Sequence, residues 1–197
     1  ITEDYDSYNW HDGFIDCRAF FWNEICDNYI EAIKYRFYSE NPTLRKNALK
    51  VALILFYKIL ICFGFIMPFI TEEIYAILFK RFVKKESIHL ETWPSQFTGI
   101  SKASAKSGEI AIEIIKILRN IKSKLRLPLN QEVSKVIITS SNKKDVKMIR
   151  NLEMDIKNTI RIVELNIIVE SKLEKSNFFP AAEEKINSIR GKLYFFK

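Results

Sequence analysis

Glycine, proline, cysteine and histidine are all scarce in this sequence of 197 residues, which contains five, five, three and two of them. Few glycines and prolines favour helices, because each interior glycine costs a helix about 1 kcal/mol and each proline about 3 kcal/mol. The cysteines, Cys17, Cys26 and Cys62, are too few and too scattered for a disulfide framework or a metal knuckle. Their use indicates a reducing compartment, so we expect a cytoplasmic protein.

The residue patterns typical of catalysis and metal binding are also missing. His11 and His89 are far apart in the sequence and have no evident partner, which argues against a nucleophile–base pair or a metal site. Glu72 and Glu73 are adjacent, so on a helix they point apart and suit capping better than paired acid–base chemistry. We therefore predict no catalytic, cofactor-binding or metal-binding residue in this chain.

The charge is distributed unevenly along the chain. Apolar residues make up 48% and charged residues 28%, as in a folded globular protein. The net charge is +7, but residues 1–97 hold 11 Lys and Arg against 13 Asp and Glu, whereas residues 98–197 hold 20 against 11. A basic second half suits a polyanionic partner, and solvated lysines on a helical surface produce the same count. Charge alone leaves both interpretations open.

The stretch FFWNEICDNYIEA, residues 20–32, predicts an amphipathic helix that runs from about residue 9 to residue 37. Residues 1–9 lack periodicity and are expected to form an irregular leading segment. Spacings of three and four residues define the apolar face, which we expect to be packed against other helices rather than stacked on bases. Its residues are Trp22, Ile25 or Cys26, Tyr29 and Ile33, and we expect Phe21 to be packed as well.

A second helix is predicted over residues 43–67, after the start signal Asn41-Pro42, and a third over residues 71–82. The second helix is apolar enough, over about 20 residues, to span a bilayer. Lys58 near its middle and the need of the neighbouring helices for a partner argue against this. We predict no membrane and a buried helix at the centre of a bundle.

The second half of the chain changes pattern partway. A helix is predicted from about Ser101 or Ala103 to Leu125, with Ile110, Ile114, Ile117, Ile121 and Leu125 as its packed stripe. Segments 133–139 and 160–169 are short and β-branched, which favours strands, and a helical pattern lies between them over 143–156. A short helix is predicted over 181–190. The aromatic end, LYFFK, has no placement that the pattern dictates.

Four motifs in order carry a family resemblance: FFWNEICDNYIEA, MPFITEEIY, SIHLETWP and LRNIKSKLRLP. Together they resemble the anticodon-binding domain of class I aminoacyl-tRNA synthetases, most closely the valyl-tRNA synthetases, over most of residues 10–130. The chain departs from that pattern at Gly64-Phe65, where the family usually has His-Pro. The stretch KASAKS, 102–107, is only superficially similar to the family's ATP-holding loop, because it has an extra residue and lies after the bundle.

The resemblance implies a mainly α fold: a helical bundle of the class I synthetase anticodon-binding type in residues 1–97, then a helix and small α/β appendage in residues 98–197. It implies tRNA(Val) as partner, and a monomer. A catalytic domain of the same chain would use ATP and Mg²⁺ to join valine to tRNA. The isoleucine or leucine enzymes of the same class remain an alternative, as does a helical interaction or membrane-associated module.

Positive charge and helical position indicate seven candidate RNA contacts. Basic side chains at such places can touch successive phosphates, although a solvated surface gives the same pattern. Four lie where the first two helices meet, and three form a stripe near the end of the helix that begins the second half. The candidates are Lys34, Arg36, Arg45, Lys46, Arg119, Lys122 and Arg126.

Overall fold

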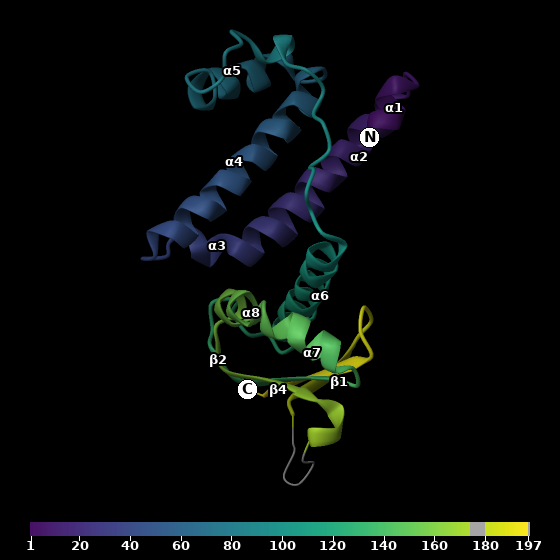
Figure 1. The fold of residues 1–197 in the computed structure, drawn as a ribbon, viewed down its shortest axis with the longest axis vertical. Helices are drawn as coiled ribbons and strands as arrows, with labels where there is room; N and C mark the ends of the chain where they lie inside the picture. The colour runs from purple at the N-terminus through teal and green to yellow at the C-terminus, as the bar shows by residue number, and fades with distance from the viewer. Residues whose placement is uncertain (174–179, 197) are drawn as a thin grey trace. The chain divides into compact units, whose positions relative to one another are not determined.

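A computed structural model of the chain describes residues 1–173 and 180–196, and it divides into two compact units. Unit 1 comprises Ile1–Glu31 and Arg36–Thr98, and unit 2 comprises Ala32–Tyr35 and Gly99–Lys197. The regular structure of unit 1 is helical, whereas unit 2 contains three helices and a four-stranded sheet (Figure 1). The prediction of a mainly α chain with an α/β appendage is confirmed.

A long helical rod dominates the start of the chain. The short helix α1 (Thr2–Asp6) replaces the irregular segment expected there, and the rod follows as α2 (Trp10–Ala19), the π-helix η1 (Phe20–Ile30) and α3 (Glu31–Phe37). Asn9 is the N-cap residue of α2, but its side chain donates to the Asp12 carboxylate, at 2.8 Å between Nδ2 and Oδ2. The rod confirms the helix predicted over residues 9–37.

The π-helix changes which side chains of the rod are packed. Hydrogen bonds in a π-helix run from residue i to i+5, so each turn contains more residues than an α-helical turn and residues three apart no longer share a face as they do in an α-helix. Ile25 and Ile33 are buried as predicted, but Trp22 is 62% exposed. Phe21 packs against Phe63 with ring centroids 5.7 Å apart. The prediction of a packed Trp22 is therefore wrong.

Helix α4 (Pro42–Gly64) begins where the sequence predicts. Asn41 Oδ1 accepts from the backbone N–H groups of Thr43 and Leu44, at 3.0 and 3.3 Å, and Pro42 occupies the first helical position. Helix α5 (Pro68–Leu78) also begins on a proline, three residues before the predicted start. Thr71 therefore lies inside the helix, where its hydroxyl donates to the Met67 carbonyl at 2.8 Å.

Helix α4 packs mainly along one side. Leu60 and Phe63 are buried, and 28% of its most apolar 18-residue window is buried. Among the described helices it alone has the length and composition to cross a bilayer. The prediction that this helix is buried on every side is wrong, because the neighbouring helices of unit 1 cover only part of its circumference. Its exposed apolar residues include Leu49, Val51, Leu53 and Ile54.

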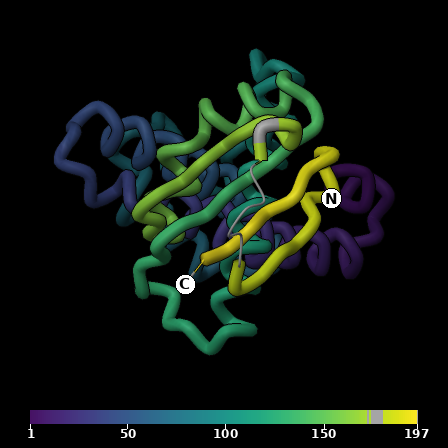
Figure 2. Tube along the Cα trace, turned by 90° about the horizontal axis from the view of Figure 1, so that it is seen from below, coloured from purple at the N-terminus to yellow at the C-terminus, as the bar shows by residue number. Residues whose placement is uncertain are grey.

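The sheet of unit 2 has the strand order β2-β1-β4-β3 (Figure 2). Strands β1 (Val133–Ser140) and β2 (Ile162–Val169) are parallel and are joined by α7 (Lys143–Arg150) and α8 (Glu153–Ile160). Helices α6 (Lys102–Lys124), α7 and α8 lie on one face of the sheet (Figure 1). This arrangement confirms the predicted strand–helix–strand unit packed on the preceding helix. Buried residues shared by α6 and the sheet include Ile110, Ile114, Leu118, Ile121, Val136 and Ile138.

The end of the chain corrects another prediction. The helix expected over residues 181–190 is instead the strand β3 (Ala182–Ile186), which pairs antiparallel with β4 (Gly191–Phe196). Pairing with a buried strand outweighs the weak helix preference of Ala-Glu-Glu-Lys. Gly191 allows β4 to approach β1 closely, because a Cβ at this position would lie 2.2 Å from the Thr139 carbonyl oxygen.

Candidate nucleic-acid interface

Two basic side chains lie near the N-terminus of α4. Arg45 and Lys46 are both exposed, and the first turn of this helix contains no acidic residue. The partial positive charge of the helix N-terminus adds to theirs, so the pair lowers helix stability but attracts anions. Within residues 1–173 and 180–196 no ion pair involves either side chain. This arrangement suits contact with phosphate.

The two other candidates from this part of the chain lie on α3. Lys34 is exposed and is grouped with unit 2, whereas Arg36 is half-buried and is grouped with unit 1. Both side chains already interact with other groups of the chain. Any phosphate contact they make would therefore compete with existing interactions, unlike one made by Arg45 or Lys46.

Lys122 lies inside unit 2 and not on its surface. The residue is 1% exposed, and its Nζ donates to the carbonyl oxygens of Leu129, Gln131 and Ile160 at 3.0, 2.6 and 2.8 Å. Ile160 ends α8, so the ammonium satisfies a carbonyl that the helix end leaves unpaired. Burial, and then the charge of Arg161, lower the pKa of the amine. Its assignment to an RNA-facing stripe is contradicted, because the side chain is enclosed and holds a loop to a helix end.

Arg119 and Arg126 differ in how they are held. Arg119 is half-buried on α6 and interacts within the chain, whereas Arg126 is exposed just beyond the helix end. Arg126 has a φ of 55°, in the left-handed region. The N–H of Leu127 donates to the Lys122 carbonyl at 2.8 Å and that of Arg126 to the Ser123 carbonyl at 3.0 Å. This is a Schellman motif, in which glycine is the usual left-handed residue.

A shallow groove on the rod was missed by the sequence reasoning. It measures about 450 Å³ and is lined by Arg18, Ala19, Trp22 and Asn23. An exposed indole can stack on an unpaired base, while a guanidinium and an amide can bond to base edges or phosphate. The signal was the polar Asn23 beside Trp22, but the α-helical spacing assigned Trp22 to the packed face.

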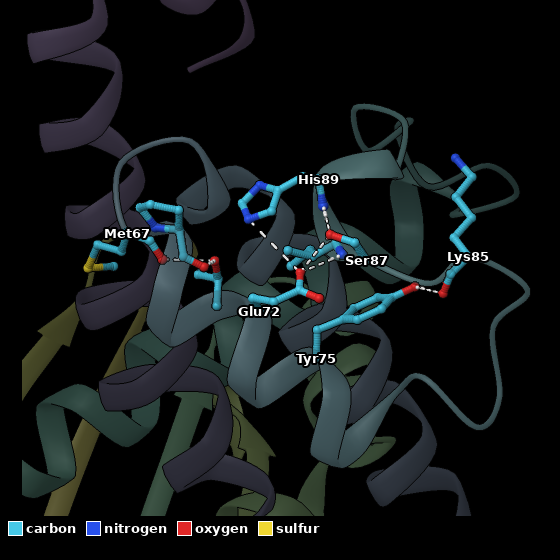
Figure 3. Close-up of polar contacts among 9 residues, drawn as sticks. Met67, Glu72, Tyr75, Lys85, Ser87 and His89 are labelled. Carbon is cyan, nitrogen blue, oxygen red and sulfur yellow. Dashed lines mark hydrogen bonds and ion pairs between the residues drawn. The ribbon is translucent and has the colours of Figure 1, made fainter.

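Residues 85–91 are held against α5 by polar contacts, several of which are drawn in Figure 3. Glu72 Oε2 accepts from the Ser87 hydroxyl at 2.8 Å and from the Ile88 N–H at 3.0 Å, and His89 Nε2 lies 3.9 Å from the same oxygen. These contacts hold the short 3₁₀ turn η2 (Ile88–Leu90) against α5. The Glu72 carboxylate thus positions a loop, and His89 lies beside it.

A second contact holds the same segment. The Tyr75 hydroxyl lies 3.0 Å from the Lys85 carbonyl oxygen and 2.8 Å from Glu91 Oε1, and the side chain is fully buried. Burial, and then the Glu91 carboxylate, raise the pKa of Tyr75 to about 12. The phenol therefore remains a hydrogen-bond donor throughout the physiological pH range.

Metal-ligating side chains do not gather at one place in the described part of the chain. Across 1–173 and 180–196, no cluster of three or more His, Cys, Asp or Glu side chains is placed to hold a metal ion. The stretch KASAKS forms the first turns of α6, where Ser101 Oγ caps the helix by accepting from the Ser104 N–H at 3.1 Å. A capped helix start explains this stretch without a role in holding ATP.

Comparison with known families identifies the class of domain. The model of the anticodon-binding domain of tRNA ligases matches residues 1–138, more than half of the chain. The chain belongs to this family.

The chain is also similar to particular members, the valine–tRNA ligases. It is 33% identical over 191 residues to that of Pyrococcus furiosus, covering 96% of this chain and 20% of the relative. It is 32% identical over 176 residues to that of Thermococcus kodakarensis and 33% over 173 residues to that of Methanothermobacter thermautotrophicus, covering 88% and 85% of this chain. The chain spans about a fifth of the length of these relatives.

Proposed function

We propose that this chain is the part of a valine–tRNA ligase that binds the anticodon arm of tRNA(Val). The observation that carries the proposal is the family match over residues 1–138 together with relatives that are valine–tRNA ligases. The whole enzyme would attach valine to tRNA in a catalytic domain of the same chain, which would use ATP and Mg²⁺. It would act as a monomer in the cytoplasm, and unit 1 would be a bundle of the class I synthetase anticodon-binding type.

The geometry supports separate contacts to the phosphates and to the bases of the RNA. Arg45 and Lys46 present charge at the start of α4, where the helix dipole also attracts phosphate. The exposed Trp22 and its neighbour Asn23 offer a ring and an amide to an unstacked base. Phosphate contacts would position the arm, and contacts to unpaired bases would supply sequence recognition.

Binding of tRNA is expected to weaken steeply with salt. Each phosphate contact releases counterions, so Arg45, Lys46 and Arg126 alone should contribute about −2 to −3 to the slope of log affinity against log salt. Affinity should then fall at least roughly 30-fold between 50 and 200 mM salt, measured by filter binding with transcripts of tRNA(Val), tRNA(Ile) and tRNA(Leu). Salt-insensitive binding would contradict the proposal, and tighter binding of tRNA(Ile) or tRNA(Leu) than of tRNA(Val) would contradict the valine assignment.

Replacing Arg126 with glycine is expected to stabilise the protein while weakening RNA binding. Glycine adopts the left-handed conformation without the Cβ penalty, so the free energy of unfolding should rise by roughly 0.5–1 kcal/mol. Loss of a phosphate contact should reduce the salt slope for tRNA by about 1. Urea denaturation followed by circular dichroism, with filter binding on the same samples, measures both. An Arg126→Gly variant with full tRNA affinity would remove Arg126 from the interface.

A further inference from the structure

A second basic surface lies on unit 2, in a groove between α7 and the strand β2. The groove measures about 410 Å³. Its walls combine three cationic and three aliphatic side chains, none of which was among the RNA contacts predicted from the sequence. The lining residues are Lys143, Val146, Lys147, Arg150, Ile168 and Val169.

The helical period places the three cations on one edge of α7. Lys143, Lys147 and Arg150 are spaced by four and three residues, so they project from one side of the helix. Val146 is buried beside them. The Arg150 guanidinium donates through Nη2 to the Ile167 carbonyl at 3.0 Å, which fixes this cation against β2. The groove is therefore formed by the crossover helix α7 and the strand β2, with Arg150 held in place by a hydrogen bond to that strand.

The charge of the groove is not neutralised within the part of the chain that the structure describes. No ion pair there involves Lys143, Lys147 or Arg150. The acid of the same helix, Asp145, is buried and accepts from the Ser140 hydroxyl at 3.4 Å. Three cations above an aliphatic floor form a site for a ligand that is anionic on one side and apolar on the other.

We propose that this groove binds one nucleotide of an RNA strand. Its phosphate would lie between the ammonium groups of Lys143 and Lys147, and the flat face of its base would lie against Val146, Ile168 and Val169. The inference rests on the proposed function and deepens it, because it gives unit 2 its own contact with the tRNA. A volume of about 410 Å³ is in the range of small-ligand sites. A membrane lipid fits less well, because a floor of three aliphatic side chains offers no channel for an acyl chain.

The test compares two double variants of the same chain with equal loss of charge. Lys143→Ala with Lys147→Ala removes the two groove ammonium groups, and Lys102→Ala with Lys144→Ala removes two exposed lysines that do not line the groove. Alanine is a good helix former, so both variants should keep their circular dichroism spectrum. The groove variant should bind tRNA roughly 30-fold more weakly at 0.1 M salt, with a salt slope smaller by about 1.5–2, and the control should change little.

The outcomes separate this inference from the proposed function. Salt-dependent tRNA binding that is equal in the two double variants would overturn the groove and leave the anticodon-arm proposal standing. Absence of tRNA binding by the unaltered chain would overturn both. Poly-glutamate or phosphatidylserine vesicles serve as competing probes. If either bound as tightly as tRNA and lost the same affinity in the groove variant, the nucleotide assignment would be wrong.

Discussion

Replacing Lys122 with methionine is expected to lower the free energy of unfolding by about 3 kcal/mol, because it removes a charged donor from three carbonyl groups at once, of which that of Ile160 is in a buried hydrogen bond. Methionine keeps the length and most of the volume of the side chain, so the loss comes from hydrogen bonding and not from a cavity. Two of the carbonyls belong to Leu129 and Gln131, so this loop should be released from the end of α8. Hydrogen exchange of residues 125–135, together with urea denaturation, measures both effects.

The neighbouring Lys124 provides a matched control for this prediction. Its Nζ lies 2.8 Å from Glu184 Oε1, but the side chain is 70% exposed. An exposed ion pair contributes about 0–1 kcal/mol, so Lys124→Met should leave stability nearly unchanged. If both substitutions cost the same, or if Lys122→Met cost less than about 1 kcal/mol, the view that Lys122 holds the loop would be contradicted.

The sequence predicted those parts of the fold in which one periodic pattern decides the structure. The isoleucines at 110, 114 and 121 define α6, and they are buried against the sheet as expected. The β-branched runs of β1 and β2 also kept their predicted state, because the pairing of these two strands in the sheet agrees with their local preference. In these segments local pattern and tertiary packing favour the same structure.

Other features depend on contacts that no local pattern encodes. Lys122 repeats the spacing of Arg119 and Arg126 and therefore resembled a surface stripe, but its ammonium meets carbonyls from residues 7, 9 and 38 positions away. Trp22 was assigned to the packed face because an α-helical period was assumed through a π-helix. Strand β3 depends on pairing with β4, which outweighs its own helix preference.

Reversing the charge of Arg45 and Lys46 is expected to weaken tRNA binding by roughly 100-fold at 0.1 M salt. Each lost phosphate contact costs close to tenfold under these conditions, and two glutamates add repulsion. Acidic residues suit a helix N-terminus, so Arg45→Glu with Lys46→Glu should keep or raise thermal stability while affinity falls. Opposite changes in the two quantities would show that these cations serve binding and not folding.

The same charge change elsewhere on unit 1 tests whether position matters. Lys80 and Arg81 are exposed after α5, and the Arg81 guanidinium lies 4.6 Å above the Phe82 ring. Lys80→Glu with Arg81→Glu alters the net charge by the same amount, so a purely long-range electrostatic effect would weaken tRNA binding equally. A contact at the start of α4 predicts that only the Arg45 and Lys46 variant loses about two units of salt slope. Equal slopes in the two variants would mean that tRNA responds to the overall charge of the chain, and Arg45 and Lys46 would not be contact residues.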